Sequence, residues 1–363
     1  MISPTSAQPP GDLAGDLTGY VGTGPFELGS YAPDQDATLV ANERYWAGEP
    51  DLRVLRWKVI PDPNAQVLAL RAGEVDVIGL TEHHSALPYE QMSQLMHDPG
   101  YRVEYRSYGR YQTLEFNVHR PAMSDIRVRQ ALNLGIDRQA MVDTLFAGLT
   151  EAAEYVSPPA PGWEWGPQQS IPPWTHDPGR AAALLDEAGW VLSPGGPVRE
   201  KDGTPLSLVL LVPFGETNAD VVSLYVQSEL QRLGIGLEVV TLEPSAASER
   251  RSTGDFDLYM SHSCGTSTFG CVGPDGLTSG YGRNTIYKDP PELVALIDTA
   301  LTAATLEQRR SGLDEVWSQL HGQALGLPLY DVNKPIAMRA GVVGVGFGPT
   351  LFTMDLQLSL IHI

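Results

Sequence analysis

The sequence predicts an α/β fold, because short apolar runs typical of strands alternate along the chain with longer segments of helical periodicity. In residues 111–148, a segment of alternating polarity precedes two segments with apolar residues on one helical face. In residues 55–77, a strand–helix–strand unit predicts a parallel pair with a right-handed crossover. At 363 residues, the chain is long enough for two to three domains.

The first part of the chain predicts loops, short strands and one helix. Residues 1–21 are rich in Pro, Gly, Ser and Asp, which is typical of a loop. Asn64 can cap a helix that ends before Gly73. The elements expected here are the strand Phe26–Ser30, a strand at 55–59, the helix Ala65–Arg71 and a strand at 75–77.

Residues 111–148 predict a half-buried strand, Tyr111–Val118, and two capped helices. Ser124 or Asp125 can cap the first helix, and Asp137 begins the second. Gly148 suits the left-handed position at a helix end. The apolar helical faces contain Val128, Ala131, Leu132 and Gly135 in the first helix, and Met141, Val142, Leu145 and Phe146 in the second.

The remainder continues the α/β alternation. Val156–Trp174 is rich in Pro and Trp, so it predicts either a loop that packs its aromatic rings on the protein or a Pro-rich ligand for a partner. Asp177 followed by Pro178 is typical of a helix start, and Thr305 with Gln308 forms a capping box. The strands expected here are Leu206–Val212, Ile235–Leu242, Phe256–Ser261 and Leu327–Val332.

Composition excludes some classes of protein. The net charge is −20, from 44 acidic and 24 basic residues, and such a field repels a phosphate backbone, so we expect no nucleic-acid partner. The hydrophobic content of 42% and the mean hydropathy of −0.14 are ordinary for a globular chain. No run of about 18 apolar residues occurs, so the sequence predicts no membrane span.

The sequence contains no motif that specifies an enzyme. It has no GxSxG, HExxH or P-loop lysine motif, and Gly22-x-Gly24 is followed by Pro25 and a strand instead of the helix of a dinucleotide site. His262 and Cys264 leave open a thiol nucleophile, as in a secreted hydrolase. That chemistry also needs an orienting group and an oxyanion hole, which no motif supplies. We therefore expect no enzyme, no cofactor and no metal site.

Seven phrases in a fixed order resemble one family. They are GTGPF at 22–26, NERYW at 42–46, AGEVDV at 72–77, DIRVRQALNLGIDRQAMVD at 125–143, HDPGRAAALLDEAGW at 176–190, LQRLGI at 230–235 and LPLY at 327–330. This series resembles the extracytoplasmic solute-binding proteins of peptide and nickel ABC transporters, family 5, and most of all the nickel-type members. The resemblance covers about residues 23–358.

The resemblance implies a two-lobed periplasmic-binding-protein fold of type II, in which residues 1–110 belong to lobe I and residues 111–332 form lobe II. Residues 333–363 would return to lobe I and end in the tail SLIHI, to which we assign no function. The chain has no counterpart of the family's signal peptide and first segment, so the resemblance implies an N-terminally truncated protein with an incomplete lobe I. Tyr111–Val118 and Leu327–Val332 would be the two crossing strands.

The resemblance also implies where a ligand binds. The loop Ser261–Gly282 would face the cleft, and its candidate ligand-binding residues are His262, Ser263, Cys264, Thr266 and Thr268. These neutral polar groups favour a polar or anionic ligand, such as a metal chelate or a small organic acid, over a plain peptide or a bare metal ion. Cys264 and Cys271 either form a disulfide or remain free thiols.

The implied function is capture of a small solute (a peptide, a nickel chelate or a related polar ligand) between the lobes by hinge closure. The protein would then deliver the solute to ABC permease subunits in the membrane. It would be periplasmic or extracellular, membrane-associated, and a monomer when full length. A ligand-sensing receptor of the same fold is the alternative within this class.

Overall fold

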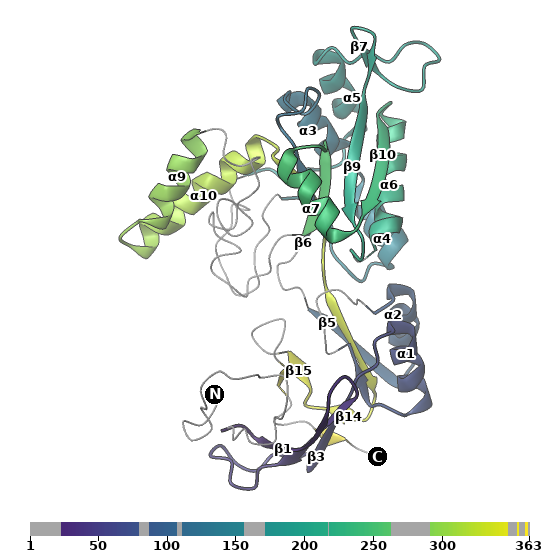
Figure 1. Cartoon of the computed structure of the whole chain (residues 1–363), viewed down its shortest axis with the longest axis vertical. Coiled ribbons are helices and arrows are strands. Elements are labelled where there is room, and N and C mark those ends of the chain that lie inside the picture. Colours follow the sequence, from purple (N-terminus) through teal and green to yellow (C-terminus); the bar gives the residue numbers. More distant parts are fainter. Residues whose placement is uncertain are drawn as a thin grey trace. The chain divides into compact units, whose positions relative to one another are not determined.

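The computed structural model describes residues 23–79, 87–106, 111–155, 171–216, 218–262, 291–347, 354–355 and 360–361. The chain divides into two compact units (Figure 1). Unit 1 contains Met1–Glu104 and Pro335–Ile363, and unit 2 contains Tyr105–Lys334. The polypeptide therefore passes from unit 1 to unit 2 and back again.

In its described residues, unit 1 contains two three-stranded sheets, two two-stranded sheets and two helices. One sheet is antiparallel, in the order β1-β2-β3, and the other has the order β4-β13-β5. Its elements are β1 (Phe26–Ala32), β2 (Asp36–Ala41), β3 (Val54–Lys58), α1 (Pro63–Ala72), β4 (Val77–Ile78), α2 (Tyr89–Met96), β5 (Tyr101–Arg106) and β13 (Lys334–Arg339). The short strands β14 (Val342–Val343), β15 (Gly346–Phe347), β16 (Met354–Asp355) and β17 (Leu360–Ile361) follow.

Two predictions in unit 1 are wrong. The strands around α1 do not form a parallel pair, because β3 pairs with β2 and β4 pairs antiparallel with β13. The local pattern predicted that β3 and β4 would pair with each other. Instead, β3 pairs with its hairpin neighbour β2, and β4 pairs with β13, which lies far away in the sequence. The cap of α1 is Asp62, whose carboxylate accepts from the Ala65 amide at 2.7 Å, and Asn64 lies inside the helix. Gly73 ends α1 at φ 73°, as predicted.

Unit 2 contains a five-stranded sheet in the order β10-β9-β11-β6-β12. β10, β9 and β11 are parallel, whereas β6 is antiparallel to both β11 and β12. The strands are β6 (Tyr111–Phe116), β9 (Ser207–Pro213), β10 (Gly236–Leu242), β11 (Leu258–His262) and β12 (Gly326–Asp331), and the hairpin β7 (Glu200–Lys201) and β8 (Thr204–Pro205) stands apart. The strands predicted in this part of the chain are thereby confirmed.

Helices from distant parts of the sequence pack around this sheet. A cluster of buried residues joins Leu211 and Tyr259 of the sheet to α7, α9 and α10, and Figure 1 shows α9 and α10 packed together. On α3 and α4, Asn133 Nδ2 donates to the Gly326 carbonyl at 3.0 Å and Arg138 Nε to the Pro328 carbonyl at 2.6 Å, which fixes both helices on β12. The helices are α3 (Ile126–Gly135), α4 (Arg138–Phe146), α5 (Pro178–Glu187), α6 (Ala219–Arg232), α7 (Pro244–Thr253), α9 (Pro291–Leu301) and α10 (Leu306–Gly322).

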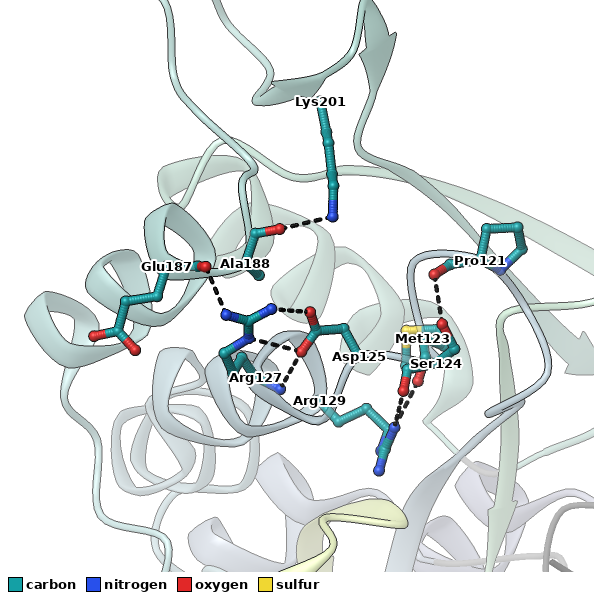
Figure 2. Close-up of polar contacts among 9 residues, drawn as sticks. All are labelled: Pro121, Met123, Ser124, Asp125, Arg127, Arg129, Glu187, Ala188 and Lys201. Carbon is teal, nitrogen blue, oxygen red and sulfur yellow. Dashed lines mark hydrogen bonds and ion pairs between the residues drawn. The ribbon is translucent and has the colours of Figure 1, made fainter.

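The start of α3 shows how local sequence sets this packing (Figure 2). Asp125 is the cap, since its Oδ1 accepts from the Arg127 amide at 2.9 Å, whereas the Ser124 hydroxyl donates to the Pro121 carbonyl. The hydrogen bond from the Arg127 guanidinium lowers the pKa of Asp125. Arg127 Nη1 also donates to the Glu187 carbonyl at 2.6 Å, and this bond joins α3 to the end of α5.

Candidate functional site

The candidate site is the edge of the unit 2 sheet at which its parallel strands end. In open α/β sheets, ligands bind beyond the carboxyl ends of the strands. β9, β10 and β11 end at Pro213, Leu242 and His262. At the same edge β6 begins with Tyr111 and β12 ends with Asp331, and these two residues are paired in register. The two strands expected to cross between the lobes, Tyr111–Val118 and Leu327–Val332, are thus neighbours in one sheet, but both lie within unit 2, and the chain passes between the units at residues 104–105 and 334–335.

Of the predicted ligand-binding residues, the structure places one. His262 is the last residue of β11, and its backbone is in register with Gln112 of β6. Ser263, Cys264, Thr266, Thr268 and Cys271 lie outside the described residues, so the predicted disulfide and the rest of this loop remain predictions. The described part of the chain holds no group of three or more His, Cys, Asp or Glu side chains suited to a metal ion.

Gln112 is a polar residue of this edge that the sequence analysis did not select. Its side chain is buried on β6, and Nε2 donates to the Ser261 carbonyl at 2.9 Å. This bond ties the beginning of β6 to the end of β11, beside His262. The sequence signal for this residue was a side-chain amide within a strand whose neighbouring residues are buried. A buried amide needs a hydrogen-bond partner, so its position indicates a contact with another segment.

Tyr330, at the end of β12, is the second such residue. Its ring packs on Phe146 of α4 with centroids 4.5 Å apart, and its phenol is hydrogen-bonded to the Asn218 side chain. Burial raises the pKa of Tyr330, and the nearby Glu216 carboxylate also raises it. Asn218 has a left-handed backbone, φ 57°, and makes no capping bond to α6. Its side chain instead joins the turn after β9 to β12.

A set of buried hydrogen bonds holds the chain where it leaves β12. The Thr150 hydroxyl donates to the Asp331 carbonyl, and the Asp331 amide donates to the Glu151 carbonyl at 2.9 Å. Asn333 Nδ2 donates to the Leu149 carbonyl at 3.0 Å. Residues 149–151 therefore fix the backbone up to residue 333, immediately before the chain returns to unit 1.

The polar side chains of Gln112, Thr150 and Asn333 are almost fully buried, and their hydrogen bonds order the strand ends at this edge. In the described residues, no helix is both long and apolar enough to span a membrane.

Comparison with known proteins identifies the relatives of this chain. The Nickel-binding periplasmic protein of Escherichia coli K12 is 23% identical over 337 residues, which are 91% of this chain and 63% of that protein. The Oligopeptide-binding protein AppA of Bacillus subtilis is 26% identical over 338 residues, 91% of this chain and 60% of that protein. The chain thus spans about 60% of the length of the curated relatives it matches.

A solved structure shows the same architecture. The structure of NikA from Brucella suis in complex with Fe(III)-EDTA is similar with a TM-score of 0.86 and 25% identity, covering 99% of this chain and 72% of that one. This likeness confirms the predicted two-lobed α/β fold class. The family model for bacterial extracellular solute-binding proteins, family 5 Middle, matches residues 1–284. The chain belongs to the bacterial extracellular solute-binding proteins of family 5.

Proposed function

We propose that this chain is the solute-binding subunit of an ABC importer. It captures a small polar solute, such as a peptide or a nickel chelate, between two lobes and delivers it to permease subunits in the membrane. The related proteins support this class, since their names describe binding of nickel and oligopeptides. The family is that of extracellular solute-binding proteins, which supports a binding protein and not an enzyme.

One observation carries the proposal. The edge of the unit 2 sheet where its parallel strands end is also the edge at which β6 begins and β12 ends. Ligands bind beyond the carboxyl ends of strands in open α/β sheets, so this edge is the part of unit 2 that we assign to the cleft. We assign lobe I to residues 1–110, lobe II to residues 111–332, and the return to lobe I to residues 333–363.

The remaining properties follow from this role. The relatives include periplasmic proteins, and the family is described as extracellular, which supports a location outside the cytoplasm. The partners are the permease subunits and a small ligand, and the full-length protein is a monomer. We also propose that His262, Ser263, Cys264, Thr266 and Thr268 contribute polar groups to the cleft, where Cys264 and Cys271 either form a disulfide or remain free thiols.

Thermal unfolding with added solutes tests the function. A solute that binds only the folded protein stabilises it by about 2.7 kcal/mol at a hundredfold excess over its Kd, so its melting temperature rises. We would screen di- to pentapeptides, free Ni²⁺, Ni²⁺ with histidine, and Fe(III)-EDTA.

Two further proteins test whether both lobes take part in binding the solute. The fragment Tyr105–Lys334 contains one side of the proposed cleft, so it should bind the same solute more weakly than the chain. A version extended to the length of the relatives should bind at least as tightly. If no solute shifts the melting temperature of the chain or of the extended version, the proposed function is wrong.

A further inference from the structure

The return connection, by which the chain passes from unit 2 back to unit 1, is short. Lys334 is the last residue of unit 2, and Pro335 is the first residue of this part of unit 1. β12 ends at Asp331 and β13 begins at Lys334, so only Val332 and Asn333 lie between the two strands. The contacts on each side of the connection decide where its backbone can bend.

On the unit 2 side, the backbone is held up to Asn333. This residue is 3% exposed, and its Nδ2 donates to the Leu149 carbonyl at 3.0 Å. The Asn333 amide donates to the Asp331 carbonyl at 3.1 Å, which closes a three-residue turn. The Thr150 hydroxyl donates to the same Asp331 carbonyl. Both the side chain and the amide of Asn333 are therefore fixed within unit 2.

On the unit 1 side, the backbone is held from Pro335 onward. Gly79 has φ 89°, a conformation that favours glycine, and its backbone packs directly against β13. A Cβ atom at Gly79 would overlap the Pro335 carbonyl oxygen and would lie 3.3 Å from Ile336 Cα. Ala337, the next residue of β13, is paired with Ile78. Close backbone contact and strand pairing thus fix this side of the connection within unit 1.

The proline limits the bend further. Its ring fixes the φ angle of Pro335 at about −65° and restricts Lys334 to extended conformations. Peptide bonds are planar, so only two dihedral angles between the fixed points keep their freedom. These angles are ψ of Asn333 and φ of Lys334.

We propose that the return connection bends at one pivot, the backbone between Asn333 and Lys334, and that Asn333 and Gly79 are the positioning residues that confine the bend there. This inference rests on the proposed function, in which two lobes enclose a solute, and it names the backbone that turns when they do so. A pivot of two dihedral angles limits the directions of rotation, so fewer orientations of the lobes compete with the closed one. Closure then loses less conformational entropy, which leaves more of the interaction energy for binding the solute.

A spin label on each unit tests the pivot without any solute. The labels would be attached at Leu68→Cys on α1 and Leu224→Cys on α6, since both positions are exposed. Cys264→Ser and Cys271→Ser remove the native thiols. Double electron–electron resonance then gives the distribution of distances between the two labels.

Two substitutions loosen the pivot from opposite sides. Asn333→Ala removes the side-chain bond to Leu149, and Pro335→Ala frees the φ angle of residue 335 and the extended restriction on the residue before it. Each should broaden the distance distribution. Hydrogen exchange measures the local effect of Asn333→Ala. The Asp331 amide, which donates to the Glu151 carbonyl at 2.9 Å, should exchange about fivefold faster.

Asn117→Ala is the matched control. Asn117 is also 3% exposed, and its Nδ2 donates to the carbonyls of Gly254 and Phe256 within unit 2. It follows the end of β6, whereas the return connection follows Asp331, which is paired with Tyr111 at the beginning of β6. Asn117→Ala should leave the distance distribution unchanged. The melting temperature of every variant shows whether the fold is intact, and Pro335→Ala decides the question if Asn333→Ala does not fold.

The outcomes distinguish the pivot from the proposed function. An unchanged distribution in the folded variants, or equal broadening in Asn117→Ala, would overturn the pivot. If the distribution broadens as expected but no solute raises the melting temperature of the chain or of its extended version, the pivot stands and the proposed function is wrong. If a solute binds but the distribution is unchanged, only the pivot is wrong.

Discussion

His321 is the residue whose ionisation we expect to affect stability. It lies on α10, 4% exposed, stacked on Trp174 with centroids 4.8 Å apart. Its Nε2 is 3.0 Å from the Pro172 carbonyl, so Nε2 carries the proton, and Nδ1 has no hydrogen-bond partner in the described part of the chain. Burial lowers the pKa of His321, and the Arg138 guanidinium lowers it further, against the opposing effect of the Pro172 carbonyl.

The lowered pKa predicts the direction of the pH dependence. The fold favours neutral His321, so its stabilising effect is complete above about pH 6.5 and is lost as the pH falls toward the folded-state pKa. The slope from this group is at most about 1.4 kcal/mol per pH unit. Urea unfolding of unit 2 between pH 7.5 and 5 should show a shallower decline for His321→Gln than for the native chain. If the free energy of unfolding falls with pH equally in both proteins, His321 does not titrate in this way.

At the scale of one element, α5 depends on Asp177, the residue immediately before it. Asp177 caps it, since its Oδ1 accepts from the Arg180 amide at 2.8 Å. Asp177→Ala removes this bond and should lower the free energy of unfolding by about 1 kcal/mol, measured by the urea midpoint. Asp177→Asn keeps an accepting oxygen and should stay close to the native value. If the Asn variant loses as much as the Ala variant, the charge of Asp177 matters more than its capping bond.

At the scale of the whole molecule, the two units should unfold separately because each has its own core. Phe116 is fully buried in unit 2, and Met338 is fully buried in unit 1. Calorimetry of the chain should show two transitions, and the fragment Tyr105–Lys334 should retain one of them. Phe116→Ala should lower the free energy of unfolding of unit 2 by about 3–5 kcal/mol, and it should lower the temperature of only that transition.

Met338→Ala is the matched control for this experiment. It removes a buried side chain of unit 1, which should lower the free energy of unfolding of that unit by about 2–5 kcal/mol. It should lower the temperature of only the other transition. A single transition that both substitutions shift equally would show one cooperative unit instead of two.

The sequence by itself determined the elements whose signals are local. The strand at 111–116, the helices that begin after Asp125, Asp137 and Asp177, and the left-handed Gly148 follow from alternation, capping and backbone freedom within a few residues. The resemblance also rests on local phrases, and it led to the family.

Only the tertiary structure decided which distant segments meet. β4 pairs with β13, about 260 residues later, and Tyr330 reaches Asn218 across the ends of two intervening strands. Gln112 and Asn333 looked like ordinary polar residues, and they belong to the candidate site because the sheet order brings their segments to one edge. Strand pairing depends on backbone hydrogen bonds between segments far apart in sequence, so periodicity shows that a strand exists but does not show its neighbours.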